Sequence, residues 1–324
     1  MAHRILVTGA AGFIGSHLCE FLLDRGDEVV GLDNFNDFYD PAIKRRHTAS
    51  LCEHAGFQMV EGDIRDEALL ERMFAEQAPT SVIHLAAMAG VRPSLMAPAH
   101  YHDVNCTGTA RLLEATRRAG VQRFIFGSSS SVYGGNESVP FREEDDVSGP
   151  VSPYAATKRS NELTCYTFHH LYGMDVICLR FFTVYGPRQR PEMAIHKFVR
   201  LVESGEPIPC FGDGSSERDY TYVDDILDGI VKAHDLAKGY RIYNLGESQT
   251  ISLRDLVDAI GKATGKTPMV DWQPDQPGDV PRTFADVSRA KNELGYNPSV
   301  GVDEGLRRFV EWYRLSLRDG GAGA

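Results

Sequence analysis

The chain has 324 residues, of which 42% are hydrophobic and 24% charged, and its formal net charge is −11 at pH 7. This length is typical of one large domain or of two unequal ones. The acidic balance argues against a nucleic acid or an anionic membrane as the main partner, and no apolar run is long enough to span a bilayer. The six cysteines show no C-x-x-C spacing and the eleven histidines form no ligand-spaced cluster, so we expect a cytoplasmic protein without a metal site.

Short apolar runs alternate with helical patterns through the first 185 residues. The runs predict strands at residues 4–7, 28–33, 57–63, 81–87, 123–129 and 175–182. Helices are predicted at residues 13–26, 66–77, 100–119 and from 153 onward. This alternation indicates right-handed βαβ units, and the nearly continuous apolar strands indicate a sheet covered on both faces. The predicted fold class is therefore α/β, with a Rossmann-type doubly wound parallel sheet.

The alternation breaks after about residue 185, where proline and glycine become more frequent, as in residues 205–225. We therefore predict a dinucleotide-binding domain over residues 1–185, to which some later segments return. A smaller mixed C-terminal lobe is predicted over residues 186–318, followed by a flexible tail at 319–324.

A glycine-rich turn, VTGAAGFIG, follows the first predicted strand and opens the first helix. Gly9 permits the tight turn, Gly12 lets a pyrophosphate approach the backbone, and Gly15 lets the helix pack closely on the sheet. Asp33 ends the second strand, where a carboxylate accepts hydrogen bonds from ribose hydroxyls and repels a 2′-phosphate, which favours NAD over NADP. Asp33 could instead cap a turn, and Asp63 could either reach the adenine edge or cap the next helix.

Tyr154 and Lys158 stand four residues apart in YAATK, on one face of a predicted helix. About 25 residues earlier, GSSSSVYG lies at the carboxyl end of a predicted strand, the edge where open α/β sheets bind ligands. A phenol is a poor base at pH 7, and a neighbouring ammonium lowers its pKa. A serine hydroxyl would then hydrogen-bond the substrate oxygen, although serines at a strand end also satisfy backbone groups. The segment predicts a proton-transfer site.

The motifs TGAAGFIGSHL, HLAA, SSSSVYG, SPYAATK, FFTVYGP and FGDGSSERDYTYVDD occur in this order and span nearly the whole chain. With them the sequence resembles the extended short-chain dehydrogenases/reductases, in the branch of NAD-dependent nucleotide-sugar epimerases, dehydratases and decarboxylases. The resemblance implies tightly held NAD, a UDP-sugar substrate bound in the C-terminal lobe, and a homodimer formed through two helices of the dinucleotide domain. A non-catalytic NAD-binding sensor with the same fold remains the alternative from a different class.

The resemblance also implies roles for individual residues. Tyr154 is the base, Lys158 binds the nicotinamide ribose and tunes the tyrosine, and Ser129 bonds the sugar hydroxyl. The residues expected to bind the cofactor are Gly9, Gly12, Phe13, Ile14, Gly15, Asp33, Asn34, Asp63, Ile64, Leu85, Ala86, Ala87, Asn105, Ser128, Tyr154, Lys158 and Phe181. Those expected to bind the substrate are Arg92, Ser129, Ser130, Thr183, Arg190, Phe211, Arg218 and Asp279.

Three of the substrate residues have expected partners. Arg218 matches the arginine that contacts the UDP pyrophosphate, Phe211 lies where the uracil packs, and Asp279 matches a residue near the substrate ribose. Each also has a structural alternative: a salt bridge for the arginine, a core contact for the phenylalanine and a turn cap for the aspartate.

The serine run indicates which of the family's reactions this chain catalyses. A 4,6-dehydratase needs an acid/base carboxylate pair, which in that family follows a threonine at this position, whereas here the run is Ser129-Ser130-Ser131. The decarboxylase branch commonly places a glutamate in this run and has an arginine-rich late segment, where this chain has QPGDVPRTFAD. The remaining reaction is 4-epimerization, in which a 4-keto sugar turns over before the hydride returns.

The segment FFTVYGPRQRPEM resembles FFTVYGPWGRPDM, which is typical of UDP-glucuronate 4-epimerases. By this resemblance Thr183 and Arg190 hold the C6 carboxylate of the sugar. The 4-keto form of glucuronate is a β-keto acid, so a clamped carboxylate suppresses loss of CO₂. Glucose 4-epimerases usually have asparagine in place of the threonine, and UDP-glucose or UDP-N-acetylglucosamine remain the alternative substrates. The departures at Arg188, Gln189 and Pro93 leave the loop shape open.

The three arginines of this region are expected to differ in role. Arg180, inside the strand, is expected to be structural. Arg188 either assists the carboxylate clamp or faces solvent.

Overall fold

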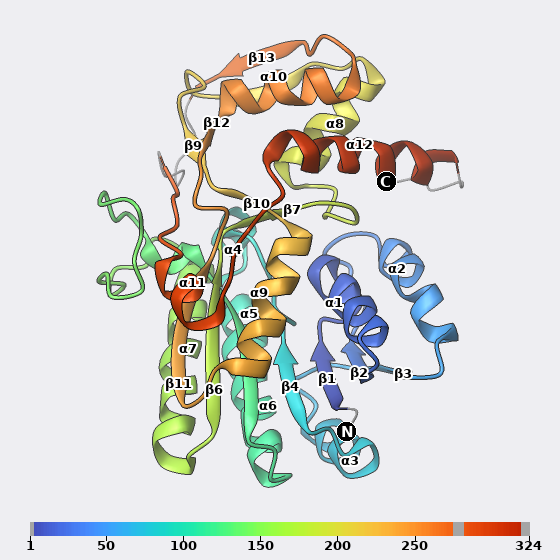
Figure 1. The fold of residues 1–324 in the computed structure, drawn as a ribbon, viewed down its shortest axis with the longest axis vertical. Helices are drawn as coiled ribbons and strands as arrows, with labels where there is room; N and C mark the ends of the chain where they lie inside the picture. The colour runs from blue at the N-terminus through green and yellow to red at the C-terminus, as the bar shows by residue number, and fades with distance from the viewer. Residues whose placement is uncertain (1–2, 275–281, 319–324) are drawn as a thin grey trace.

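The computed structural model describes residues 3–274 and 282–318 of the chain. Within this part, seven strands form one parallel sheet in the order β11-β6-β5-β4-β1-β2-β3, so the strand order reverses between β1 and β4. The strands are β1 (Arg4–Thr8), β2 (Glu28–Asp33), β3 (Phe57–Glu61), β4 (Ser81–His84), β5 (Arg123–Ser129), β6 (Asp175–Phe181) and β11 (Tyr240–Leu245). This is the doubly wound topology that the sequence predicts, with helices on both faces of the sheet (Figure 1).

The helices bury two separate cores against the sheet. The helices on one face are α1 (Phe13–Asp24), α2 (Pro41–Glu53), α9 (Val223–Leu236) and α11 (Ser288–Leu294), and those on the other are α3 (Glu67–Gln77), α6 (Gly108–Arg118) and α7 (Pro153–Tyr172). Alternate residues of β1 point to opposite faces, so Ile5 and Val7 join one core and Leu6 joins the other. Both faces of the central strands are therefore buried, which explains their continuous apolar sequences.

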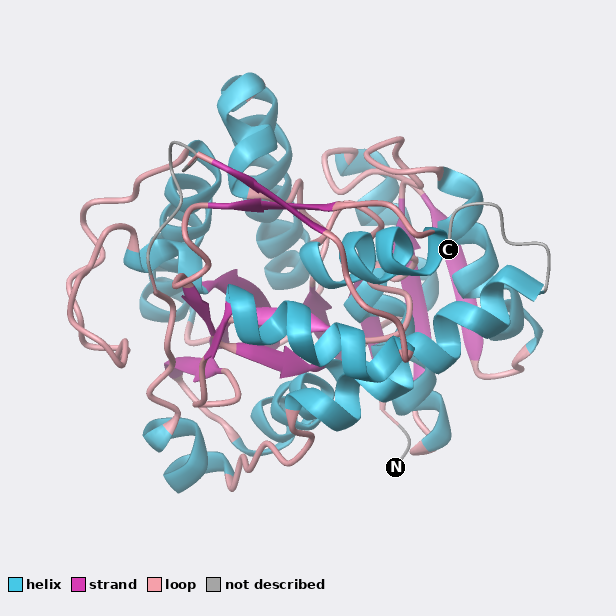
Figure 2. Ribbon diagram, turned by 90° about the horizontal axis from the view of Figure 1, so that it is seen from above, coloured by secondary structure: helices cyan, strands magenta, loops and turns pink. Residues whose placement is uncertain are grey.

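The smaller lobe lies over the carboxyl ends of the sheet strands (Figure 1), and Figure 2 looks down on it. Its strands pair as β7 (Thr183–Tyr185) with β10 (Tyr220–Tyr222), β8 (Ile208–Phe211) with β13 (Val270–Gln273), and β9 (Glu217–Arg218) with β12 (Ile251–Ser252). Its helices are α8 (Ala194–Ser204), α10 (Leu253–Thr264) and α12 (Val302–Arg318). The chain passes from the sheet layer to the lobe and back. Strand β11 and helix α9 follow β7 and β8 of the lobe in sequence but pack on β6 of the sheet.

The long helical region expected over residues 100–119 is confirmed, because α5 (Pro98–His102), the π-helical turn η1 (Asp103–Thr107) and α6 follow one another without a break; α4 (Val91–Met96) precedes them. Two predicted strand ends are wrong. The strands expected to reach 63 and 87 end at Glu61 and His84, because the residues beyond them leave the ladder and turn toward the cavity described below. A short 3₁₀ helix, η2 (Ser130–Tyr133), follows β5 directly. Helix α2, strand β11 and the three two-stranded sheets of the lobe were not predicted from the sequence.

Across residues 3–274 and 282–318, no helix combines the length and the apolar character that crossing a bilayer requires. The predicted tail at 319–324 lies outside the described residues.

Candidate active site

A cavity of about 790 Å³ opens between the carboxyl ends of the sheet strands and the lobe. It includes the point where the strand order reverses between β1 and β4, the place where doubly wound sheets bind ligands. The predicted site residues that line it are Gly9, Gly12, Phe13, Ile14, Gly15, Asp33, Asn34, Asp63, Ile64, Leu85, Ala86, Ala87, Arg92, Ser128, Ser129, Ser130, Tyr154, Lys158, Phe181, Thr183, Arg190 and Arg218. Asn105 and Phe211 are not among the lining residues, and Asp279 lies outside the described residues.

The glycine turn forms one end of this cavity, where its geometry excludes side chains. A Cβ on Gly15 would lie 2.0 Å from the carbonyl oxygen of Gly9, and Gly9 itself has a φ of 73°. Helix α1 begins after Gly12 with no side-chain cap and no acidic residue in its first turn. Its first amides therefore have no side-chain cap among the described residues, and their residues line the cavity, which suits a pyrophosphate.

Asp33, at the end of β2, is held by two backbone donors. Its Oδ1 accepts from Phe35 N at 2.8 Å and its Oδ2 from Ala11 N at 3.1 Å. Burial raises the pKa of this carboxyl, and the backbone hydrogen bond from Phe35 and the charge of Lys44 oppose that rise. Each carboxylate oxygen keeps a second lone pair, so the aspartate both shapes the turn and can accept from a ribose hydroxyl.

Asp63, after β3, has a different environment from the one expected. Its carboxylate pairs with Arg65 at 2.8 Å and accepts from Asn34 Nδ2 at 3.0 Å. Hydrogen bonds from Arg65 are the main reason that the pKa of Asp63 falls to about 2. The cap of α3 is Asp66, so the alternative in which Asp63 caps this helix is excluded, and its reach to the adenine edge stays a prediction.

Helix α7 places Tyr154 and Lys158 on the cavity wall. Ser152 caps the helix by accepting from Ala155 N, and a proline occupies the first turn. Lys158 Nζ donates to Gly127 O at 2.6 Å and lies 5.8 Å from the centroid of the Tyr154 ring. Burial lowers the pKa of Lys158 to about 8 from its ordinary 10.5.

The Tyr154 side chain is half-buried, and burial raises the pKa of its phenol. A hydrogen bond with the Ser129 side chain and the positive charge of Arg190 oppose that rise. Arg190, which was predicted to bind the substrate carboxylate, therefore also lowers the pKa of Tyr154 through its charge. The expected effect of Lys158 on the tyrosine stays a prediction.

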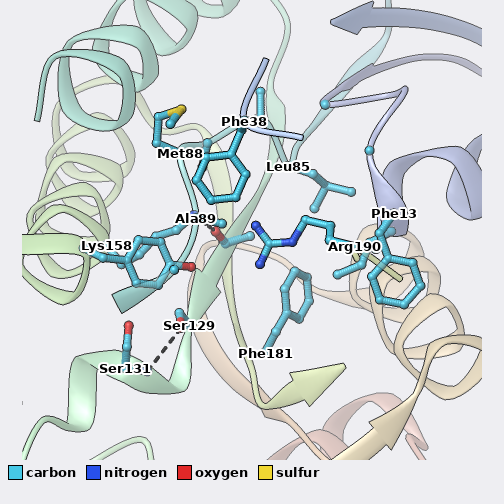
Figure 3. Close-up of a pocket in the computed structure, with 18 of the residues that line it drawn as sticks. Phe13, Phe38, Leu85, Met88, Ala89, Ser129, Ser131, Lys158, Phe181 and Arg190 are labelled. Carbon is cyan, nitrogen blue, oxygen red and sulfur yellow. Dashed lines mark hydrogen bonds between the residues drawn. The ribbon is translucent and has the colours of Figure 1, made fainter. Parts of the chain in front are cut away.

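The serine run contains both structural and cavity-facing hydroxyls. Ser128 Oγ donates to the buried Glu162 Oε1 at 2.7 Å, whereas Ser129 Oγ accepts from Ser131 N at 3.2 Å (dashed in Figure 3). The Ser131 hydroxyl lines the cavity and is buried without a hydrogen-bond partner among the described residues. Unpartnered buried hydroxyls are costly, so this one points to a ligand or to bound water.

Arg190 enters the cavity from the side opposite α7. Its guanidinium points toward Ser129 and Lys158 in Figure 3 and lies 5.4 Å from the centroid of the Phe38 ring. Its Nε lies 3.2 Å from Glu192 Oε1. Because the pairing uses Nε, the two terminal nitrogens remain directed to the cavity, where a carboxylate could meet them in a fork.

The other two arginines of the segment lie elsewhere. Arg180 is fully buried and pairs in two-point fashion with Glu162, at 2.9 and 3.0 Å, which confirms its structural role. Arg188 neither joins the clamp nor simply faces solvent, because its Nη2 donates to Glu20 on α1 at 2.6 Å.

Two predicted site residues, Asn105 and Phe211, lie behind the cavity surface. Asn105 accepts from Met88 N at 2.8 Å and donates to Met88 O at 3.0 Å, so it fixes the loop after β4 that lines the cavity. Arg92 lies 5.4 Å from the ring centroid of Phe211. The phenylalanine is therefore next to a lining residue rather than on the wall itself.

One wall of the cavity, which is not among the predicted site residues, is formed by the loop after β2 and the start of α2. Phe38, Tyr39 and Lys44 all line the cavity. The Tyr39 hydroxyl is buried and has no hydrogen-bond partner among the described residues, and Lys44 Nζ donates to Asn36 O at 2.9 Å. The signal was the polar and aromatic run NDFYD directly after Asp33, at a strand end of the ligand-binding edge.

A profile of the family described as GDP-mannose 4,6 dehydratase matches residues 6–309 of the chain. The chain belongs to this family. The resemblance to extended short-chain dehydrogenases/reductases is thereby confirmed. Several similar proteins are named for one reaction, the 4-epimerization of a UDP-sugar.

The UDP-glucuronate 4-epimerase of Thermodesulfobacterium geofontis is 44% identical over 96% of this chain and 96% of its own length. The structure of Bacillus cereus UDP-glucuronic acid 4-epimerase with UDP-glucuronic acid and NAD is 36% identical, with a TM-score of 0.89 over 96% of this chain and 99% of that one. Thermotoga maritima UDP-glucose 4-epimerase with UDP-glucose is 34% identical, with a TM-score of 0.90 over 97% and 99%.

Proposed function

We propose that the protein is an NAD-dependent UDP-sugar 4-epimerase that interconverts UDP-glucuronate and UDP-galacturonate. The observation that carries the proposal is the presence of two groups on one cavity: Tyr154 with Ser129, and Thr183 with Arg190. The first pair suits proton transfer at a sugar hydroxyl and the second suits a carboxylate. Full-length relatives named UDP-glucuronate 4-epimerase support the same substrate.

The residues at the β1–β4 edge fit NAD. The open amides of α1 and the glycine cradle suit its pyrophosphate, and the carboxylate of Asp33 suits an unphosphorylated adenosine ribose. Phe181 and Lys158 lie further along the cavity, where the nicotinamide end would bind. When bound, NAD accepts the C4 hydride of the sugar and returns it.

The remaining steps belong to side chains of this chain. Tyr154 takes the proton of the C4 hydroxyl as the hydride leaves, while Ser129 hydrogen-bonds the same oxygen, and a 4-keto sugar results. The keto sugar turns over, the hydride returns to the opposite face, and Tyr154 returns the proton to the oxygen. Thr183 and Arg190 hold the carboxylate away from the orientation that would release CO₂.

Dehydration is disfavoured despite the description of the family. The acidic residues that line the cavity within the described part of the chain are Asp33, Asp63 and Glu192. The first two lie at the dinucleotide end and the third pairs with Arg190, so none follows Ser129 in the position that an acid/base carboxylate would need.

The test is incubation with UDP-glucuronate and no added NAD, followed by sugar analysis of the products. The expected product is UDP-galacturonate. UDP-glucose and UDP-N-acetylglucosamine are supplied in parallel, and turnover of either one without turnover of the uronate would replace the proposed substrate with the neutral sugar.

The proposal includes a homodimer in the cytoplasm. Helix α7 exposes Leu163, Tyr166 and Leu171 at 53%, 49% and 61%, an apolar set that suits a helix of another copy. Leu163→Glu should convert the dimer to a monomer in light scattering, and a monomeric parent protein would contradict the dimer.

The six cysteines are free of disulfides, as suits a reducing compartment such as the cytoplasm.

A further inference from the structure

The loop that carries Arg190, residues 186–193, is fastened to two different parts of the protein. Contacts from Pro187 and Arg188 reach α1 of the sheet layer, and contacts from Gln189 reach β7 and α8 of the lobe. We infer that Arg188 and Gln189 are positioning residues that fix this loop so that Arg190 faces the catalytic tyrosine. The inference rests on the proposed function, because it explains how the carboxylate site gets its geometry.

The attachment to α1 has two parts. Arg188 Nη2 donates to Glu20 Oε1 at 2.6 Å, with the two side chains 20% and 33% exposed. One turn earlier on the same helix, His17 Nε2 donates to Pro187 O at 2.8 Å. Burial, followed by the charge of Arg188, lowers the pKa of His17 to about 4, so the imidazole is neutral at pH 7 and keeps this donor.

The attachment to the lobe runs through Gln189, which is 2% exposed. Its Nε2 donates to Val184 O at 3.0 Å, and its Oε1 accepts from His196 N at 3.2 Å at the start of α8. The His196 ring donates from Nδ1 to Gln189 O at 2.5 Å. The buried side-chain amide of Gln189 therefore hydrogen-bonds the backbone of β7 on one side and of α8 on the other. These two bonds hold the loop in place against the lobe.

The backbone at Arg188 shows that the loop is held against its local preference. Its φ is 63°, a left-handed value that residues other than glycine rarely adopt. An ion pair from Arg188 and the buried amide of Gln189 maintain this conformation.

The attachment to α1 has a functional consequence because α1 also supplies the amides proposed for the cofactor pyrophosphate. The same helix therefore sets the position of the dinucleotide and of the loop that carries Arg190. Arg190 is two residues beyond Arg188, and the turn closes where Met193 N donates to Arg190 O at 3.1 Å. Loss of the Arg188–Glu20 pair should let the guanidinium drift from the sugar carboxylate.

The variants are Arg188→Asn, Glu20→Gln and the double variant. Asparagine tolerates the left-handed conformation, so the first change removes the guanidinium with little effect on the backbone preference. The matched control is Arg200→Gln on α8, which removes an exposed ion pair with Glu206 at 3.5 Å. Arg190→Ala is the reference for complete loss of the carboxylate contact.

The measurements are KM and kcat for UDP-glucuronate, and the inhibition constant of UDP, which lacks the sugar. Each single variant should raise the uronate KM about tenfold, since small misplacements of a binding group have effects of that size or larger, while the UDP constant stays within about twofold. The double variant should match the single ones, because either change breaks the same pair. The control should resemble the parent enzyme.

Three results would overturn the inference. If Arg190→Ala raises the uronate KM but Arg188→Asn and Glu20→Gln do not, the loop attachment has no role and the proposed function stands. If Arg190→Ala leaves the uronate KM unchanged, the carboxylate clamp itself is wrong, and the inference falls with that part of the proposed function. Additive effects in the double variant would also show that the two residues do not act as a pair.

Discussion

Replacement of the buried Lys158 by methionine should abolish activity and yet change stability in a way that depends on pH. The ammonium group is buried beside the Phe126 ring, 4.9 Å from its centroid, and has Gly127 O as its hydrogen-bond acceptor. Burial lowers its pKa to about 8 from 10.5, so the folded state binds this proton less tightly than the unfolded state does. A methionine of similar length carries no charge and removes that cost.

The size of the effect follows from the two pKa values. A difference between 10.5 and about 8 corresponds to about 3 kcal/mol of destabilisation wherever the lysine is charged in both states. The cost is fully present below pH 8 and is relieved as the pH rises toward 10.5, because the folded protein loses the proton first. Methionine also leaves Gly127 O without its donor, which costs about 1–3 kcal/mol at every pH.

The assay is urea unfolding of parent and Lys158→Met protein at several pH values from 7 to 10, with nucleotide removed from both. The stability of the variant relative to the parent should fall by about 2–3 kcal/mol across this range. Other titrating groups are common to both proteins and cancel in the difference. Lys238→Met, at an exposed position after α9, controls for the loss of one surface lysine.

A stability difference that stays constant from pH 7 to 10 would refute the reasoning, since it would mean that Lys158 titrates alike in the folded and unfolded states. A variant that loses stability equally at all pH values would point to the hydrogen bond with Gly127 alone.

Three further outcomes are expected. Tyr154→Phe should lower kcat by about 10²–10⁴-fold in product analysis while NAD affinity is kept, and retained turnover would exclude the tyrosine as the base. Ser129→Ala removes a hydrogen bond that lowers the Tyr154 pKa, so the rising limb of kcat against pH should move to higher pH; an unmoved limb would show that the serine does not tune the base. Glu162→Gln leaves the buried charge of Arg180 without its partner and should cost about 3 kcal/mol in urea unfolding. Arg159→Gln, which removes a partly exposed partner of the same glutamate, should cost much less, and equal losses would contradict the importance of the buried pair.

Sequence alone identified the features that depend on short-range geometry. The alternation of strands and helices gave the doubly wound sheet because each element's apolar period reflects how it is buried. The glycine turn and the Tyr154–Lys158 pair were visible because their function needs a fixed spacing along one strand–helix unit or one helix turn. The structural role of Arg180 was predictable from its place inside a buried strand.

Other features were decided by contacts between distant parts of the chain. Arg188 could not be assigned from its neighbours because its partner, Glu20, is 168 residues away. The loop after β2 supplies a wall that no spacing rule indicates, and Asn105 supports the cavity by fixing Met88 rather than by lining it. The placement of Arg190 likewise depends on the loop after β7, which brings its guanidinium into the cavity.

The sequence thus determined the sheet, the glycine cradle and the residue types for proton transfer, since these follow from local periodicity and spacing. The tertiary structure supplies the physical basis for the shared site of Thr183, Arg190 and Tyr154, because β7 and the loop after it lie over the carboxyl ends of the sheet strands, across one cavity from α7. It also decided that the loop of Arg190 is tied to α1, where a salt bridge and a histidine hydrogen bond join segments that no sequence pattern relates.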